Sequence, residues 1–424
     1  MESEREGASK LGKQLVRSSP LLGLPNEILQ HIASIIPTDR DVSLLSRTCK
    51  ELHGRLLAPE STIWRVRFKR RYDLPQGRES RELKPEYQTR AIVLPRKLDF
   101  KQSENEQQKI WLQVVQTMVR ESTTLPVEIE TSKTYQRIQD IMTQVEFFSN
   151  PKRIKPSDMF CAVQLCLTPM SLDMTVTQAC GRPGYDIGTV YSFQEDIDGP
   201  FIKHETLDLN KLLHIRSFWQ NHLLNSQEST NFSEIYSNLP RNHKPKARNI
   251  DVANTSMICT FWFGLWSCIH PLPDTIEEFT RRESCADLED HIHQVDVMTL
   301  ELEYNSEEIW PEACASVISR YEAAECVAYF QGVQKIHGDS EAANPLFGFT
   351  ESISFPYGGF KGWTRVCFCI CEGVDENGDS VFNDDDSWVH GYEGVIPPGS
   401  GVMLGRWLDL KDTSGRGPFL FWDV

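Results

Sequence analysis

Residues 24–36 read Leu-Pro-Asn-Glu-Ile-Leu-Gln-His-Ile-Ala-Ser-Ile-Ile and are followed by Pro37. Pro25 suits the first turn of a helix, where its missing N–H removes no hydrogen bond. The carboxylate of Glu27 faces the positive end of the helix dipole. We therefore expect a short amphipathic helix from about Pro25 to Ile36, ended by Pro37. Its apolar residues recur at helical spacing: Ile28, Leu29, Ile32, Ile35 and Ile36.

A second helical stretch is expected directly after Pro37, because Thr38, Asp39 and Asp41 offer side chains that cap a helix N-terminus. Its apolar residues recur at intervals of three and four: Val42, Leu45, Cys49, Leu52 and Leu56, with Leu44 and Leu57 beside them. A unit of about 45 residues lies near the limit of independent stability. We expect it to pack against a partner, either the rest of this chain or another protein.

The order of these residues resembles the F-box. The family pattern L-P-x-E-I-L-x-x-I corresponds to residues 24–32, D-L-x-x-L-x-x-V-C-[KR]-x-W to residues 41–52, and the closing L-W to residues 63–64. The chain departs from the pattern with Leu52 for Trp, Thr48 for Val and Ile63 for Leu. The resemblance covers only about 45 residues.

The F-box resemblance implies that the module docks on Skp1, which joins it to a cullin and a RING protein in an SCF-type ubiquitin ligase. It also implies which residues form or support the Skp1-binding surface. They are Leu24, Pro25, Glu27, Ile28, Leu29, Ile32, Val42, Leu45, Cys49, Leu52 and Trp64.

Composition limits the class of protein. The 424 residues are 40% hydrophobic, which is enough for a sizeable core. A membrane-spanning helix needs about 18 consecutive apolar residues, and the sequence contains no such run, so no span is predicted. Twelve scattered cysteines without a C-x-x-C pair indicate a reducing compartment, cytoplasmic or nuclear, rather than a disulfide framework. The net charge of −16 argues against nucleic acid as the partner. A basic stretch from Arg65 to Lys97 is interpreted as solvated surface.

Four regions are expected along the chain. Residues 1–19 are a polar, disordered leader, residues 20–72 the F-box, residues 73–155 a basic linker with a helical spacer, and residues 156–424 a β-rich substrate-recognition domain. The spacer helices are predicted at Glu104–Arg120 and Thr134–Phe148, with a turn-rich bridge at Pro151–Pro156.

The C-terminal half predicts an α+β fold with a barrel- or sandwich-like β-rich body. Short β-branched and aromatic runs predict strands at Gly188–Phe193, Ser256–Gly264, Val297–Tyr304 and Thr364–Ile370. Helices are expected between them at Lys211–Leu224 and Asp274–Cys285.

Residues 392–407, Tyr-Glu-Gly-Val-Ile-Pro-Pro-Gly-Ser-Gly-Val-Met-Leu-Gly-Arg-Trp, predict two strands around a Pro-Gly turn, closed by Gly405 where a side chain would be excluded. The segment is similar to one near the end of many filamentous-fungal F-box proteins, of the form Y-E-G-V-x-x-P-G-G-x-x-x-x-G-R-W. Gly362–Val366 resembles the G-W-x-R-[IV] strand that precedes it there. The glycine spacing fits neither a dinucleotide-binding nor a P-loop pattern.

Three groups of residues suggest metal sites, and each has a plainer interpretation. Cys367, Cys369 and Cys371 alternate on one side of a strand, and we interpret them as small buried hydrophobic residues. His291 and His293 lack an identifiable third ligand. The acidic run Asp375–Asp386 lacks the glycine position of a calcium loop and favours a solvated hairpin. No metal or cofactor is therefore expected.

No catalytic motif such as G-x-S-x-G or H-E-x-x-H occurs, so we expect a non-catalytic protein. The leading hypothesis is a substrate receptor of an SCF-type ubiquitin ligase that holds an unidentified protein target near the conjugating enzyme. The alternative is an F-box protein that acts outside a ligase, with a β-domain that binds a small molecule or RNA. Aromatic residues at a barrel rim would form a recognition surface. The candidate target-binding residues are Trp262, Trp363, Arg365 and Trp407.

Overall fold

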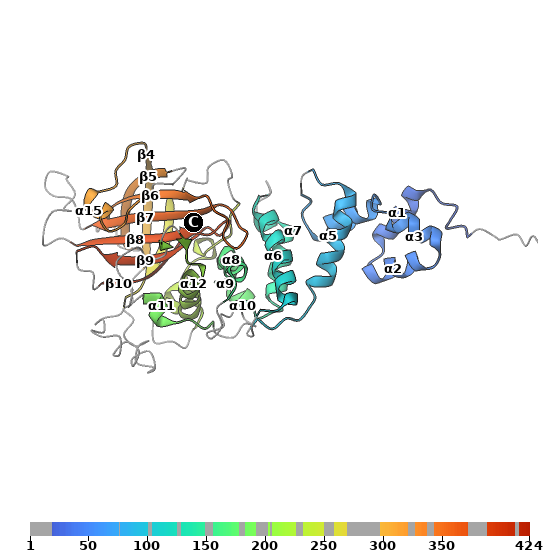
Figure 1. Cartoon of the computed structure of the whole chain (residues 1–424), viewed down its shortest axis with the longest axis horizontal. Coiled ribbons are helices and arrows are strands. Elements are labelled where there is room, and N and C mark those ends of the chain that lie inside the picture. The colour runs from blue at the N-terminus through green and yellow to red at the C-terminus, as the bar shows by residue number, and fades with distance from the viewer. Residues whose placement is uncertain are drawn as a thin grey trace, which may run out of the picture. The chain divides into compact units, whose positions relative to one another are not determined.

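The structure is a computed structural model of the whole chain. It divides into two compact units, one up to Ile92 and one from Val93 onward, and each is described by itself (Figure 1). The residues described are 19–75, 77–100, 104–124, 129–148, 156–177, 183–191, 202–203, 206–225, 232–249, 258–268, 297–320, 327–336, 343–371, 388–411 and 415–424. The expected leader, the bridge at Pro151–Pro156 except for Pro156, the helix at Asp274–Cys285, the histidine pair and the acidic run lie outside these ranges.

The N-terminal unit is helical. Its helices are α1 (Asn26–Ile35), α2 (Asp39–Arg47), α3 (Lys50–Leu57), α4 (Thr62–Arg71) and α5 (Ser80–Val93). The helix expected after Pro25 is confirmed as α1. The stretch expected after Pro37 is two helices rather than one, because Cys49 takes an extended conformation and its Sγ accepts a hydrogen bond from the Leu52 N–H, capping α3.

The C-terminal unit begins with a helical layer. Its helices are α6 (Glu106–Thr124), α7 (Lys133–Met142), α8 (Asp158–Cys166), α9 (Thr168–Ser171), α10 (Met174–Thr177), α11 (Ile187–Tyr191), α12 (Leu209–Leu224), α13 (Phe232–Asn238) and α15 (Glu312–Ala315), with 3₁₀ turns η1 (Ile129–Thr131) and η2 (Arg241–His243). The predicted spacer helices are confirmed as α6 and α7, and the helix expected at Lys211–Leu224 is α12.

The strand expected at Gly188–Phe193 is wrong, because Ile187–Tyr191 forms helix α11. The carboxylate of Asp186 accepts a hydrogen bond from the Thr189 N–H and thereby satisfies a free donor at the start of that helix. Local capping therefore overrides the strand preference of a short β-branched run. The barrel begins at β3, about 100 residues later than the β-rich region expected from residue 156.

The body of the unit is a closed eight-stranded antiparallel barrel (Figure 1). Its strands are β3 (Phe261–Trp266), β4 (Met298–Asn305), β5 (Val327–Ile336), β6 (Ala343–Ile353), β7 (Trp363–Cys371), β8 (Val389–Ile396), β9 (Val402–Asp409) and β10 (Arg416–Asp423); a separate small sheet pairs β1 (Ile202–Lys203) with β2 (Thr206–Leu207). Each barrel strand pairs with its neighbour in sequence, and β10 closes the barrel on β3. The expected α+β class with a barrel-like body is confirmed, as is the hairpin of β8 and β9.

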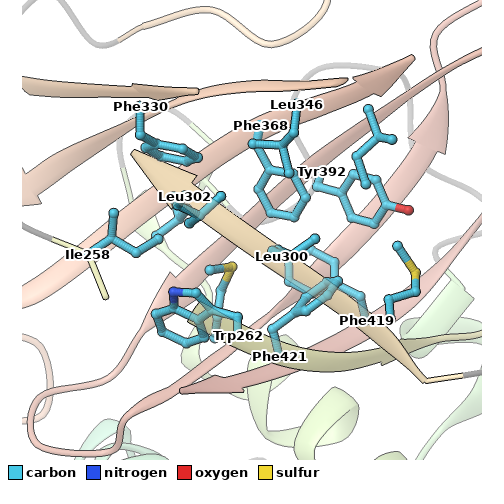
Figure 2. Packing of buried hydrophobic residues seen from close by; sticks show 14 of the residues in the cluster. Ile258, Trp262, Leu300, Leu302, Phe330, Leu346, Phe368, Tyr392, Phe419 and Phe421 are labelled. Carbon is cyan, nitrogen blue, oxygen red and sulfur yellow. The ribbon is translucent and has the colours of Figure 1, made fainter. Parts of the chain in front are cut away.

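The barrel interior is packed with large side chains (Figure 2). Period-two alternation directs Phe368 of β7, Tyr392 of β8 and Phe419 of β10 inward, and the rings of Phe368 and Tyr392 stack with centroids 4.5 Å apart. Glycines on the neighbouring, paired strands make room for such rings. A Cβ at Gly264 would lie 1.9 Å from the ring of Phe421. The interior is thus a dry aromatic core at its middle level.

Helix α12 packs against β9 and β10 on one side and against α8, α11 and α13 on the others. Helices α11 and α12 lie along this part of the barrel (Figure 1). Its side chains are buried around almost its whole circumference, polar ones included. A helix buried all round belongs to a core rather than to a surface, and α12 therefore joins the helical layer to the barrel.

Candidate functional site

The N-terminal unit has a small apolar core of its own. Leu29 and Ala33 of α1, Leu52 and Leu56 of α3, and Ile63 of α4 are buried against one another. The side chains of Thr38 and Ser61 accept hydrogen bonds at the N-termini of α2 and α4, as the sequence predicts for Thr38. The unit therefore buries part of its apolar surface in its own core. Its own side chains also accept hydrogen bonds from backbone N–H groups at the N-termini of two helices.

Arg55 of α3 fixes the segment that precedes α1. Its guanidinium donates to the carbonyl oxygen of Leu22 at 2.9 Å, to that of Leu24, and to the side chain of Asn26. Hydrogen bonds to a charged donor contribute about 1.5–3 kcal/mol each when they are well formed. The segment from Leu22 to Leu24 is thereby held in place before the start of α1.

Asp39, the first residue of α2, joins three elements. It accepts hydrogen bonds from Nε of buried Arg67 in α4 at 2.7 Å and from the hydroxyl of Tyr87 in α5 at 3.0 Å, and it forms an ion pair with Arg71 at 3.2 Å. Burial, with the negative charge of Asp39 beside it, raises the pKa of Tyr87 to about 12. The tyrosine remains a neutral donor, and the orientation of α2 relative to α4 and α5 is fixed.

A row of isoleucines on α1 stays outside this core. Ile28 is 47% exposed and Ile35 is 59% exposed, and half-buried Ile32 lies between them at helical spacing, so the three share one face of α1. Leu44 of α2 is also exposed, at 50%. Single exposed apolar residues are ordinary, whereas the isoleucines of α1 form a group on one face of one helix.

The residues expected to bind Skp1 divide into three groups. Pro25, Glu27 and Ile28 are exposed; Leu24, Ile32, Leu45 and Cys49 are half-buried; Leu29, Val42, Leu52 and Trp64 are buried within the unit. The side chains of the buried group lie inside the unit and are not exposed on its surface. Ile35 and Leu44 are additional surface residues that the pattern match left out, although Ile35 lies seven residues after Ile28 and therefore on its face.

The four residues proposed to contact a target are all buried in the barrel wall or core. Trp262, Trp363 and Trp407 point their indole N–H groups at the backbone carbonyls of Cys259, Phe360 and Ser267. They are structural in the conformation described. The partly exposed aromatic residues Trp266 and Trp388 lie at one end of the barrel instead.

Arg365, the fourth candidate, lies on the outer face of β7 under residues 316–320. Its guanidinium contacts Glu351 of β6 and Glu393 of β8, each at 2.7 Å, and donates to the carbonyl of Ser319 at 2.9 Å. All three charged side chains are almost fully buried. This is a structural ion network rather than a docking surface.

Cys367, Cys369 and Cys371 lie on the outer face of β7, as their alternation predicts, and pack with Trp310 and Cys314 of the segment above. Burial raises the pKa of Cys371 to about 11, so its thiol is protonated at neutral pH and a poor nucleophile. Within the described ranges, no three or more His, Cys, Asp or Glu side chains are grouped so as to hold a metal ion. In the same part of the chain, none of the helices combines the length and apolarity needed to cross a membrane.

Arg248 and Asp423 form an ion pair at the end of the barrel where β3 begins. Nε of Arg248 pairs with the carboxylate of Asp423 in β10 at 2.6 Å, and the Arg248 side chain also contacts Sγ of Cys259. The Arg248 N–H donates to the carbonyl of Gly399 at 2.9 Å. Burial raises the pKa of Asp423 to about 7 despite the opposing charge of Arg248.

The raised pKa of Asp423 predicts a pH dependence of stability. Between about pH 4 and pH 7 the folded protein binds a proton at Asp423 that the unfolded chain releases, so the free energy of unfolding falls as pH rises, by up to about 1.4 kcal/mol per pH unit. Asp423→Asn removes this slope. Urea unfolding from pH 4.5 to 8 is expected to show the variant gaining on the unsubstituted protein as pH rises; a pH-independent difference would contradict the assignment.

Comparison of the chain with models of known protein families, with curated proteins and with solved structures finds no match. The F-box resemblance therefore rests on the residues of segments 24–32, 41–52 and 63–64 alone.

Proposed function

We propose that the chain is a substrate receptor of an SCF-type ubiquitin ligase, in which the N-terminal helical unit binds Skp1 and the C-terminal unit holds a protein target. The observation that carries the proposal is the exposed apolar row of α1 in a segment whose order of residues resembles the F-box. In this role the chain does no chemistry itself. It raises the effective concentration of the target near the conjugating enzyme.

Several positions of the resemblance support this proposal. Arg55 holds the segment before α1 through the backbone carbonyls of Leu22 and Leu24, so this segment is ordered before a partner binds. Ile28 and Ile35 present side chains that an apolar groove would cover. Preordering lowers the entropy that binding must overcome, and burial of the isoleucines supplies the driving force.

Ile28→Asp is the sharpest test of this surface. Because Ile28 is already half exposed, the change leaves folding nearly intact, whereas a carboxylate buried in an apolar interface weakens binding by at least about 30-fold, on the order of 2 kcal/mol or more. Co-purification shows whether the full chain binds Skp1. Titration calorimetry then measures the loss of affinity for Skp1. Ile92→Asp is the matched control, since Ile92 is 63% exposed in α5, outside the resemblance.

Equal Skp1 binding by Ile28→Asp and the control would end the proposal, as would a chain that binds no Skp1 at all. Binding of Skp1 without recruitment of a cullin would favour the alternative, an F-box protein acting outside a ligase. Reconstitution with Skp1, cullin and RING protein, followed by ubiquitin transfer to a captured target, separates the two.

A further inference from the structure

Three cysteine thiols from two parts of the chain lie together on the outside of the barrel. Cys369 and Cys371 belong to β7, and Cys314 belongs to α15, in the segment 306–320 that packs on this part of the barrel wall. All three side chains are buried, and all three thiols are free. Because Cys314 lies far from the other two in the sequence, only the fold brings their sulfur atoms together.

The position of Cys314 over β7 is fixed by backbone hydrogen bonds. Its N–H donates to the carbonyl of Pro311 at 3.0 Å, and its own carbonyl accepts from the N–H of Ile318 at 2.8 Å. Further along the same segment, the guanidinium of Arg365 in β7 donates to the carbonyl of Ser319 at 2.9 Å. The Cys314 thiol is therefore held in place by its own segment and by the strand beneath it.

Cys369 is the β7 thiol that shares a hydrogen bond with Cys314. Cys371 interacts with Cys314 only through charge, and Cys367 on the same face interacts with the charged groups of the Arg365 network instead. Sulfur atoms in hydrogen-bond contact need only small side-chain rotations to reach the roughly 2 Å of an S–S bond. The geometry therefore favours a bridge between Cys314 and Cys369.

The thiol of Cys369 is a poor nucleophile by itself. Burial, followed by the hydrogen bond to Cys314, raises the pKa of Cys369, so little thiolate is present at neutral pH and oxidation is slow. A pair of thiols in contact nevertheless differs from a single buried thiol. Oxidation of either sulfur atom places it directly beside a second thiol that can react with it.

We propose that Cys314 and Cys369 are a redox pair, which hydrogen peroxide converts into an intrachain disulfide that fastens residues 306–320 to β7. Disulfides in reducing compartments are usually transient and redox-sensing. The free thiols of the structure are accordingly the reduced state of this pair. The inference does not rest on Skp1 binding or on the proposed ligase function.

The reaction consumes one molecule of peroxide. The thiolate of one cysteine attacks a peroxide oxygen and the O–O bond breaks; a sulfenic acid forms, and the departing hydroxide leaves as water with the proton of that thiol. The second thiol then attacks the sulfenic sulfur, the S–S bond forms, and the S–O bond breaks. The second hydroxide leaves as water with the second thiol proton. The two thiols thus lose two electrons, and peroxide is reduced to two molecules of water.

Peroxide reaches the pair when the segment 306–320 opens locally. α15 is a single short helix of four residues, and short elements at a surface open at a lower free energy than the strands of a closed barrel. The disulfide opposes this opening. It also closes a loop from residue 314 to residue 369 and so restricts the unfolded chain, and we expect oxidation to stabilise the C-terminal unit.

The test uses the full chain in its folded state. The protein is treated with millimolar hydrogen peroxide, the remaining thiols are blocked with iodoacetamide, and tryptic peptides are mapped without reduction. We expect peptide 283–320 to be linked to peptide 366–406, and dithiothreitol to release the link. The midpoint of thermal unfolding of the oxidised chain should rise by about 5 °C.

Cys314→Ala and Cys369→Ala are each expected to abolish both the linked peptides and the rise in the midpoint of thermal unfolding. Cys367→Ala is the matched control, because Cys367 is equally buried on the same face of β7 but interacts with other groups. Cys371→Ala should likewise keep the link. If an alanine variant fails to fold, fragmentation of the linked peptides from the unsubstituted chain identifies the bridged cysteines directly.

Linked peptides that persist in Cys314→Ala would overturn the proposal, since Cys285 of the same peptide would then form the bridge. Loss of the link in Cys371→Ala, with the link kept in Cys369→Ala, would overturn it as well. Peroxide that yields only sulfinic or sulfonic acids, without linked peptides, would equally refute it. None of these measurements involves Skp1, so failure of the redox proposal is distinct from failure of the ligase proposal.

Discussion

Replacement of Arg365 by methionine is expected to lower the free energy of unfolding by about 3–5 kcal/mol, because breaking a buried ion pair leaves an uncompensated charge in the interior. Glu351 and Glu393, both buried, each lose a contact of 2.7 Å to the Arg365 guanidinium. Urea unfolding followed by tryptophan fluorescence measures the loss of stability.

Arg320→Met is the matched control for this prediction. Arg320 pairs with Glu308 at 2.8 Å, but the two side chains are 36% and 65% exposed, so the same substitution should change stability by about 1 kcal/mol or less. Glu351→Gln added to Arg365→Met should recover part of the loss, since one of the two buried carboxylates that contacted Arg365 is then neutral. A single Arg365 variant within about 1 kcal/mol of the unsubstituted chain would show that the network is not buried in solution.

Gly405→Val is expected to destabilise the barrel strongly. A Cβ at this position would lie 2.2 Å from the Glu393 carbonyl oxygen and 2.5 Å from the Cα of Gly394, which are backbone atoms of the paired strand. Relief requires β8 and β9 to separate, and we expect a loss of about 3 kcal/mol or more. The midpoint of thermal unfolding and the yield of soluble protein report it.

Gly54→Ala provides the comparison. Gly54 lies inside α3, and a Cβ added there would have no atom within 4 Å outside its own helix, so alanine should stabilise the N-terminal unit by about 0.5–1 kcal/mol. A Gly405→Val chain as stable as the unsubstituted protein would mean that the pairing of β8 with β9 differs from the register described.

The spacing of apolar residues predicted those helices and turns that depend on nearby residues alone. The first helix, the two spacer helices, the helix at Lys211–Leu224 and the hairpin around Pro397–Gly401 all follow from apolar spacing and turn residues. The strand expected at Gly188–Phe193 failed because a single carboxylate, that of Asp186, caps a helix there. Strand registers and barrel closure depend on pairing across many residues, which no local pattern encodes.

The candidate sites show the same limit. Aromatic composition correctly drew attention to tryptophans in the barrel, but Trp262, Trp363 and Trp407 are buried, and inward or outward orientation decides this one residue at a time. Arg365 reads in sequence as a candidate surface cation because its partners, Glu351 and Glu393, lie 14 and 28 positions away. No sequence pattern identifies His390, because only the fold brings it among three tryptophans.

Closure of the barrel by β10 on β3 has a consequence during synthesis. Strands β3 to β9 emerge from the ribosome in pairing order, yet the seam between β3 and β10 forms only after about 150 further residues have been added. Until then both β3 and the newest strand present unpaired backbone edges, which are templates for intermolecular pairing. The nascent chain is therefore most prone to association just before β10 appears.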